Sequence, residues 1–170
     1  MANTFVKISS VTVGSGGASS IDFSSISGAY TDLMLFHSVR SNNAALNDAI
    51  ILKINGSTAN LSGRFIYGNT PAANVATDVG GFYGGIASAA TSTASTFSST
   101  YLYFSNYSSS NNKSFSVDSA MENNTTTAFP FLVSGLWSDT SVITALNISP
   151  ATGTLFNQYS TATLYGIKKS

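Results

Sequence analysis

Apolar side chains recur at every second residue along most of this chain, and this pattern constrains the fold more than any other feature. No segment of helical length has apolar residues spaced three and four apart, as an amphipathic helix requires. The cleanest alternation runs from Lys113 to Met121, where Phe115 and Val117 alternate with serines. Side chains of a strand point to the two faces of a sheet in turn. The pattern therefore predicts an all-β protein.

About nine or ten short segments read as strands, and clusters of Gly, Ser, Asn and Asp separate them. They are Thr4 to Val13, Ile21 to Phe23, Thr31 to Arg40, Ala49 to Ile54, Gly63 to Tyr67, Tyr101 to Tyr107, Lys113 to Met121, Phe129 to Trp137, Ser141 to Ile148 and Tyr159 to Lys168. That many strands in one domain pack as two sheets more readily than as one open sheet. We expect a jelly-roll-like β-sandwich, with an immunoglobulin-like sandwich as the alternative.

Two local patterns add detail to this expectation. In the segment from Thr31 to Arg40, apolar side chains fall on both faces, which predicts a strand buried on both sides. Asn55-Gly56 is a turn-forming pair between two predicted strands, with a loop that continues to about Asn60.

The length of 170 residues predicts a single domain, residues 1–170. One stretch stands apart, a Gly-, Ala-, Ser- and Thr-rich excursion at about residues 72–99 with one apolar island from Phe82 to Ile86. We expect a long connection with one short strand inside it. Long loops are often functional, so this excursion and the N-terminal strand are the candidates for partner contact.

Charge and composition exclude several classes of function. Charged residues make up 8% of the chain and the formal net charge is zero, so the few cations cannot neutralise a run of phosphates in nucleic acid. No apolar run is long enough to span a bilayer, and the first residues do not resemble a secretory signal. The absence of cysteine excludes disulfides and thiolate metal sites. An uncharged surface rich in hydroxyls is also compatible with burial against other protein, which hints at assembly.

Candidate catalytic residues are scarce. A Ser-His-Asp triad would have to use His37, the single histidine, but alternation places it on an apolar face with Leu35 and Val39. A glycosidase would need two carboxyl groups about 5 to 10 Å apart across a cleft, and only Asp118 and Glu122 are neighbours in sequence. Solvated charges at a strand end explain those two better. We expect no catalytic residue and no enzymatic activity.

Candidate binding motifs are equally weak. Asp118 and Glu122 with Asn123 and Asn124 offer oxygens to Ca²⁺, but without the spacing of a calcium loop. The glycines at residues 14–17 and 80–81 lack the Lys-Ser/Thr ending of a phosphate-binding loop. Seven Asn-x-Ser/Thr sequons are present where about four would arise by chance from this composition, and without a secretory signal they carry little weight. They start at Asn55, Asn60, Asn106, Asn112, Asn123, Asn124 and Asn147. We therefore expect no cofactor-binding or metal-binding residue.

Aromatic residues are the one feature above background. They crowd one segment and include the single tryptophan, namely Tyr101, Tyr103, Phe104, Tyr107 and Trp137. Three roles remain open for them: filling the sheet faces of the core, anchoring a protein interface, or stacking on sugar rings.

Three stretches, in order along the chain, carry a resemblance to a known group of proteins. They are Ile8 to Gly14 followed by Ile21-Asp22-Phe23 and Tyr30 to Leu33, then Asn111 to Asp118 with Gly135 to Ser138, and finally Gln158 to Lys168. The chain resembles small virion structural proteins of tailed bacteriophages over nearly its whole length. These motifs are strand and turn patterns, so they identify the group better than the task.

The resemblance implies a particle component without enzymatic activity, in one of two roles. The first is a decoration (cement) protein on the outer capsid surface, a homo-trimer that bridges major capsid subunits and stabilises the shell. The second is a tail-associated fibre head or baseplate module that binds a host surface glycan. Both roles suit a β-sandwich, so the fold does not choose between them. The chain contains no heptad, β-helix or collagen-like repeat that could form a shaft, which favours the first.

Overall fold

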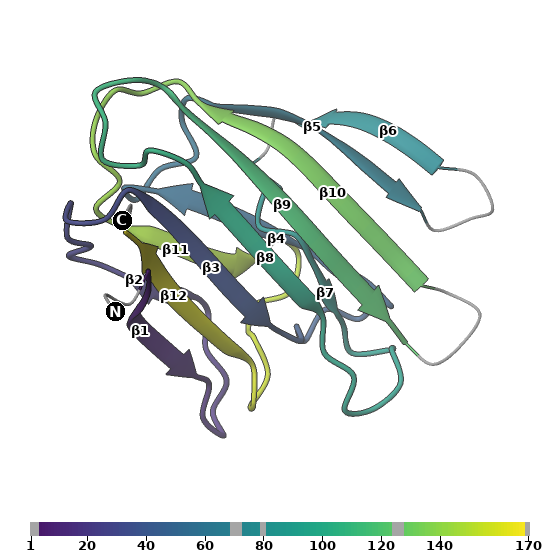
Figure 1. Cartoon of the computed structure of the whole chain (residues 1–170). Helices are drawn as coiled ribbons and strands as arrows, with labels where there is room; N and C mark the ends of the chain where they lie inside the picture. Colours follow the sequence, from purple (N-terminus) through teal and green to yellow (C-terminus); the bar gives the residue numbers. More distant parts are fainter. Residues whose placement is uncertain (1–3, 69–72, 79–80, 124–127, 169–170) are drawn as a thin grey trace.

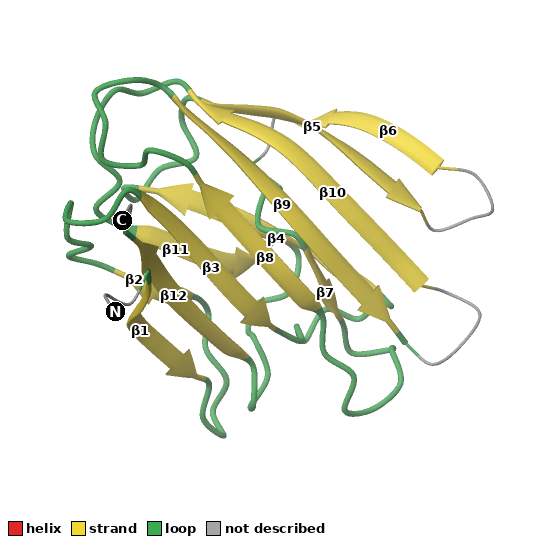
Figure 2. Cartoon of the chain, viewed as in Figure 1, coloured by secondary structure: helices red, strands yellow, loops and turns green. Residues whose placement is uncertain are grey.

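The computed structural model describes residues 4–68, 73–78, 81–123 and 128–168, and every regular element in these ranges is a β-strand (Figures 1 and 2). The all-β prediction is confirmed. The strands are β1 (Phe5–Thr12), β2 (Ile21–Phe23), β3 (Asp32–Ser38), β4 (Asn47–Ile54), β5 (Leu61–Gly68), β6 (Ala73–Asp78), β7 (Ile86–Ser88), β8 (Ser99–Phe104), β9 (Lys113–Glu122), β10 (Ala128–Trp137), β11 (Leu146–Pro150) and β12 (Thr161–Ile167).

The strands form two antiparallel sheets that pack face to face. The larger sheet has eight strands in the order β1-β12-β3-β8-β9-β10-β5-β6, and the smaller has four in the order β2-β11-β4-β7. Figure 1 shows the smaller sheet behind the β12, β3 and β8 part of the larger one, so the β5 and β6 end extends beyond it. The β-sandwich prediction is confirmed at this level, whereas the eight-plus-four strand order does not by itself establish a jelly-roll topology.

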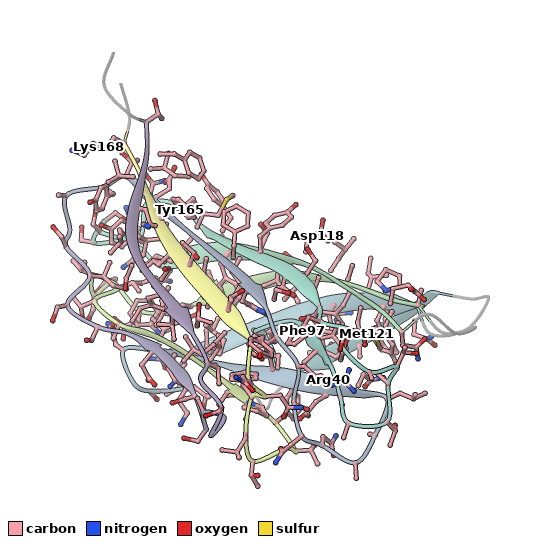
Figure 3. The ribbon with its side chains drawn as sticks, turned by 90° about the horizontal axis from the view of Figure 1, so that it is seen from below. Arg40, Phe97, Asp118, Met121, Tyr165 and Lys168 are labelled. Atoms are coloured by element: carbon pink, nitrogen blue, oxygen red, sulfur yellow. The ribbon has the colours of Figure 1, made fainter. Side chains whose placement is uncertain are left out.

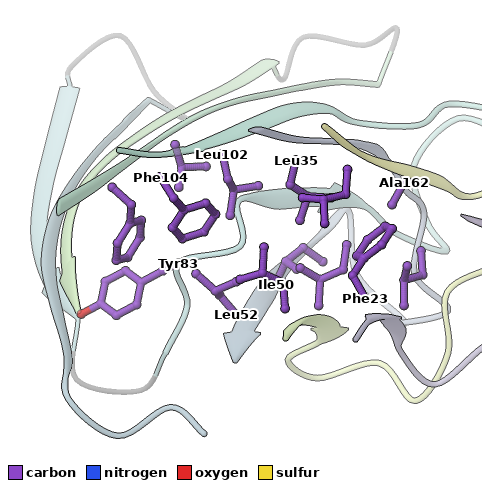
Figure 4. Packing of buried hydrophobic residues seen from close by; sticks show 14 of the residues in the cluster. Phe23, Leu35, Ile50, Leu52, Tyr83, Leu102, Phe104 and Ala162 are labelled. Atoms are coloured by element: carbon purple, nitrogen blue, oxygen red, sulfur yellow. The ribbon is translucent and has the colours of Figure 1, made fainter. Parts of the chain in front are cut away.

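The core lies between the two sheets and follows from the alternation. Leu35 of β3 and Leu102 of β8 point inward from the larger sheet, and Ile50 and Leu52 of β4 meet them from the smaller one (Figure 4). All four side chains are fully buried. Burying one such side chain stabilises the fold by roughly 1.5–3 kcal/mol, so this double layer of aliphatic residues fixes which face of each strand is inside.

The excursion between β5 and β8 contains two strands where one was expected. β7 follows the apolar island and pairs with β4, while β6 pairs with β5 at the edge of the larger sheet. Val75 is the single large apolar residue of β6, so the sequence of that strand carries no alternation that could reveal it.

The strand predicted from Ser141 to Ile148 begins later, at Leu146. The backbone amides of Thr144 and Ala145 donate to the side-chain oxygen of Asn55, at 2.9 and 3.0 Å. That side chain replaces a neighbouring strand as their partner, so the sheet ladder starts only after them. The last predicted strand likewise begins at Thr161, because Tyr159 has a left-handed φ of 71°.

The Asn55-Gly56 turn is confirmed, but it does not connect paired strands. Both residues have positive φ, 50° and 82°, and Ile54 bridges Ser57 across them. These angles are typical of a two-residue type I′ turn. After it the chain leaves β4 in the smaller sheet and enters β5 in the larger sheet, so the turn reverses the chain between layers.

Candidate functional site: the outer face of the eight-stranded sheet

The outer face of the eight-stranded sheet carries exposed apolar side chains that a sandwich core does not need. Phe36 of β3 is 40% exposed and Met34 is half-buried, so the prediction that this strand is buried on both faces is wrong. The smaller sheet covers only the inner face, where Leu33, Leu35 and His37 lie. Outward-facing residues of β3 therefore meet solvent.

One cross-strand row on this face spans six neighbouring strands, and we call it the outer apolar row. From β3 to β6 its members are Phe36, Tyr101, Asp118, Leu132, Ile66 and Val75. The five apolar or aromatic members are 39–64% exposed. Single exposed apolar residues are normal, but here five of them share one cross-strand row that only Asp118 interrupts, and such grouping marks an interaction surface.

Aromatic side chains extend this surface toward β1. The ring of Tyr165 on β12 lies 5.7 Å from that of Phe36 and 5.8 Å from that of Phe5, centroid to centroid. Phe5, Phe36, Thr163 and Tyr165 line a shallow groove of about 430 Å³, which we call the aromatic groove. Figure 3 shows Tyr165 and Asp118 projecting from the same side of the molecule, away from Arg40.

A second, more polar cavity opens where β3 begins and β8 and β12 end. It has a volume of about 310 Å³ and is lined by Asp32, Tyr103, Ser105, Asn106, Ile167 and Lys168, together with Thr31. We call it the Asp32 cavity. The Asp32 carboxylate accepts hydrogen bonds from the Tyr103 hydroxyl and from the Asn106 backbone amide, each at 2.8 Å. Partial burial and the bond to Asp32 raise the pKa of Tyr103, so its hydroxyl remains a donor.

His37 lies in the core and lacks the surroundings of a catalytic base. Its Nε2 is 2.8 Å from the carbonyl oxygen of Gly84, which can only accept, so Nε2 carries the proton. Burial lowers the pKa of His37 to about 4, and the bond to Gly84 only partly opposes this. The placement agrees with the predicted position of His37 on an apolar face with Leu35.

Asp118 and Glu122 share the outer face of β9, which continues through Glu122. They are four residues apart in an extended strand, which separates their Cα atoms by about 13 Å. The Tyr101 hydroxyl donates to Asp118 at 3.2 Å, and Glu122 is exposed. Both carboxylates lie on the open outer face of one strand, and no described cavity places them across a cleft as a glycosidase requires.

The remaining weak motifs serve local structure. Gly17, with φ of 71°, closes a turn by donating to the carbonyl of Gly14, and no helix follows it. Gly81 packs against Thr58. Within the described residues, no three His, Cys, Asp or Glu side chains gather to hold a metal ion. Asn124 of the calcium motif and Gly80 lie outside the described residues.

The aromatic cluster divides between core and surface. Phe104, Tyr107 and Trp137 are buried, whereas Tyr101 is 39% exposed and Tyr103 is half-buried. The alternation of β8 separates them, since residues 101 and 103 point out and residues 102 and 104 point in. Core filling therefore accounts for part of the cluster, and two of its tyrosines belong to the outer face.

Two buried cations, Arg40 and Lys113, were not identified from the sequence. Both donate hydrogen bonds to backbone carbonyls and so hold loops in place. The Arg40 guanidinium donates to the carbonyls of Ser92, Thr93 and Thr96 at 2.9–3.0 Å, which anchors the end of the excursion. Burial lowers the pKa of Arg40. Lys113 donates to the carbonyl of Ser141 and lies over the Trp137 ring, and burial likewise lowers its pKa.

Sequence reasoning missed the outer residues Phe5, Leu132, Ile66 and Val75. The signal was present for Phe5, Leu132 and Ile66, because each occupies an outward position of a predicted strand, whereas β6 carries no alternation that could have revealed Val75. The sequence does not show that no described element covers that face; only the packing of the two sheets shows it.

A comparison of the chain with protein-family models, with curated proteins and with solved structures finds no match. In the described part of the chain there is also no helix of the length and apolarity needed to cross a membrane.

Proposed function

We propose that this chain is a non-enzymatic structural protein of a tailed-phage virion, a decoration protein that binds the outer capsid surface. The observation that carries the proposal is the outer apolar row, above all the exposed Leu132, Ile66 and Val75 at its β10-β5-β6 end. A stable protein interface needs an apolar centre that excludes water, and this row supplies one on a rigid sheet. The resemblance of the sequence to small phage virion proteins supports a role in the particle, and we take the major capsid protein as the proposed partner.

The proposed mechanism is binding alone, without a covalent step. Docking would bury the β10-β5-β6 end of the row across the junction between capsid subunits. Anything that binds the assembled shell but not its separated subunits stabilises the shell by mass action. The burial of His37 in the core, where its Nε2 bonds the Gly84 carbonyl, supports a role without a catalytic histidine.

A closed homo-oligomer completes the proposal, because repeated lattice positions are usually occupied by symmetric assemblies. We expect a trimer, with three times the 17.6-kDa mass of one chain. Sedimentation equilibrium of the purified protein measures this mass directly. A monomer at all concentrations would contradict the trimer, but it would not test the docking surface.

Copy number per virion tests the function. Protein staining of virions purified from the phage that encodes this chain, scaled to the major capsid protein, should give a count on the order of hundreds, as expected for icosahedral lattice positions. A count of roughly three to a few dozen would instead assign the chain to the tail, where a glycan-binding module is the alternative. Absence from the particle would overturn both.

Purified protein should also rebind shells that lack it and raise their melting temperature. Shells incubated with the protein and washed by sedimentation report binding, and differential scanning calorimetry of the same sample reports stabilisation. Binding without stabilisation would contradict the cement mechanism.

A further inference from the structure

We infer that the Asp32 cavity and the neighbouring aromatic groove form one binding site for a neutral oligosaccharide. This site does not depend on the virion role proposed above. It lies at the β1-β12-β3-β8 end of the outer face, whereas the docking residues Leu132, Ile66 and Val75 lie at the other end. A sugar chain and a protein partner could therefore occupy the face together.

The Asp32 cavity has the donor and acceptor set that recognises a polyol. A carboxylate offers about four acceptor positions, and the Tyr103 hydroxyl and the Asn106 amide occupy two of those on Asp32. The remaining positions can accept from two hydroxyl groups of one sugar ring. The side chains of Ser105 and Asn106 add a hydroxyl and a carboxamide, which both donate and accept.

The walls and size of the cavity also suit a sugar. Ile167 and the ring of Tyr103 provide an apolar wall for the C–H face of a pyranose. The volume of about 310 Å³ is at the lower end of the range of roughly 300–1,000 Å³ for ligand sites. A ligand of one ring fits that size better than a larger organic molecule.

The two cavities adjoin through the strand register. Ile167, in the wall of the Asp32 cavity, pairs with Phe5, which lines the aromatic groove. Tyr165 is two residues from Ile167 on the same face of β12, about 7 Å along the strand, so a second ring linked to the first would reach Tyr165, whose ring contacts that of Phe36. Exposed aromatic rings stack on the apolar faces of sugars, so the groove offers a platform for that second ring.

The geometry of Asn106 provides a clean variant. Asn106 has φ of 50°, in the left-handed region where glycine is unstrained, and Asp32 is bound by its backbone amide. Asn106→Gly therefore removes the carboxamide from the cavity and leaves the Asp32 network intact. Ser95→Gly is the matched control, because Ser95 is exposed, has φ of 63° and lies beyond the other end of β8.

Ligand-observed NMR with glucose, galactose, mannose, cellobiose, lactose and maltose tests the inference. We expect at least one disaccharide to bind with a Kd on the order of 1 mM and more tightly than its component sugars. Asn106→Gly should weaken binding of both mono- and disaccharide about fivefold, the loss of a hydrogen bond worth roughly 1 kcal/mol. Tyr165→Ala should remove only the advantage of the disaccharide. Ser95→Gly should bind like the unmodified protein.

Three results would overturn the inference: no saturation transfer to any of these sugars, binding unaffected by both Asn106→Gly and Tyr165→Ala, or equal loss in Ser95→Gly. Thermal melting of each variant accompanies the titrations, so that loss of binding is interpreted only for a folded protein. Shell binding should persist in Asn106→Gly, which separates this site from the docking surface.

Discussion

The imidazole of His37 in β3 donates a hydrogen bond from Nε2 to the backbone carbonyl of Gly84, 2.8 Å away in the segment that leads into β7. The two residues are 47 positions apart in sequence and join the larger sheet to the segment that lies along β4. Nδ1 of the same ring is buried and has no hydrogen-bond partner among the described residues. A neutral histidine thus forms a polar link inside an apolar core.

This link predicts acid sensitivity. The pKa of His37 is about 4 in the fold and 6.5 unperturbed, so the unfolded chain takes up a proton first as the pH falls. The contribution of neutral His37 to the free energy of unfolding is fully present above about pH 6.5 and is lost as the pH falls toward 4. At pH 4.5 we expect the free energy of unfolding to be about 2–3 kcal/mol lower than at neutral pH. Urea unfolding at pH 7.5 and at pH 4.5 measures this. His37→Gln, which keeps a donor for Gly84 but does not titrate, should flatten the dependence, and an unchanged slope in that variant would contradict the assignment.

We predict that the larger sheet has no room for a side chain at Gly135. A Cβ atom at this position would lie 2.2 Å from the Phe115 ring on the neighbouring strand β9. Phe115 packs on Phe104 and Tyr83 and has little room to move, so Gly135→Ala should destabilise the fold by about 1–3 kcal/mol. Gly14→Ala is the control, because nothing lies within 4 Å of its added Cβ. Equal unfolding midpoints for the two variants would show that the sheet adjusts.

We predict that Arg40 keeps the C-terminal part of the excursion, residues 89–98, in one conformation. Its guanidinium is the shared donor for the carbonyls of Ser92, Thr93 and Thr96. Arg40→Met keeps the apolar stem and leaves these carbonyls without that donor, so we expect a loss of about 2–4 kcal/mol. Hydrogen exchange should accelerate most at residues 89–98. Arg64→Met, at an exposed position, should change stability by less than about 0.5 kcal/mol; if the two variants behave alike, the anchoring role is wrong.

We predict that substitutions in the outer apolar row weaken binding to the shell without unfolding the protein. Leu132→Ser and Ile66→Ser each remove a 49% exposed apolar side chain, so the fold should keep its stability while shell binding weakens about tenfold or more. Co-sedimentation with shells measures the binding. Leu46→Ser is the matched control, because Leu46 is 41% exposed and lies outside the row. If Leu46→Ser weakens binding as much, the row is not the docking surface.

Much of the fold was predictable because strand formation follows local pattern. The alternation of β9 and β10 is long enough to define which face is inside, and their buried and exposed residues follow it without exception in the described positions. β6 was not predictable, since one large apolar residue carries no period. The start of β11 was also missed, because the side chain of Asn55 satisfies the backbone of residues 144–145 from a distance of about 90 positions.

The candidate site was predictable only in part. Tyr101 and Tyr103 were identified as unusual, and the alternation of β8 places them together on one face. Asp32, Asn106 and Ile167 carry no motif, and they line one cavity only because β3, β8 and β12 are neighbours in the sheet.

The sequence by itself determined that the chain is all-β and which side chains share a face of each strand, because a period of two is a property of the extended backbone. Tertiary structure alone decided that eight strands join one sheet and four the other, and that the smaller sheet leaves the far face of the larger one open. Strand order and layer packing depend on contacts between residues far apart in the chain, which local pattern does not encode. Phe36 and Leu35 are equally apolar neighbours in sequence, and only the position of the second sheet makes one a surface residue and the other core.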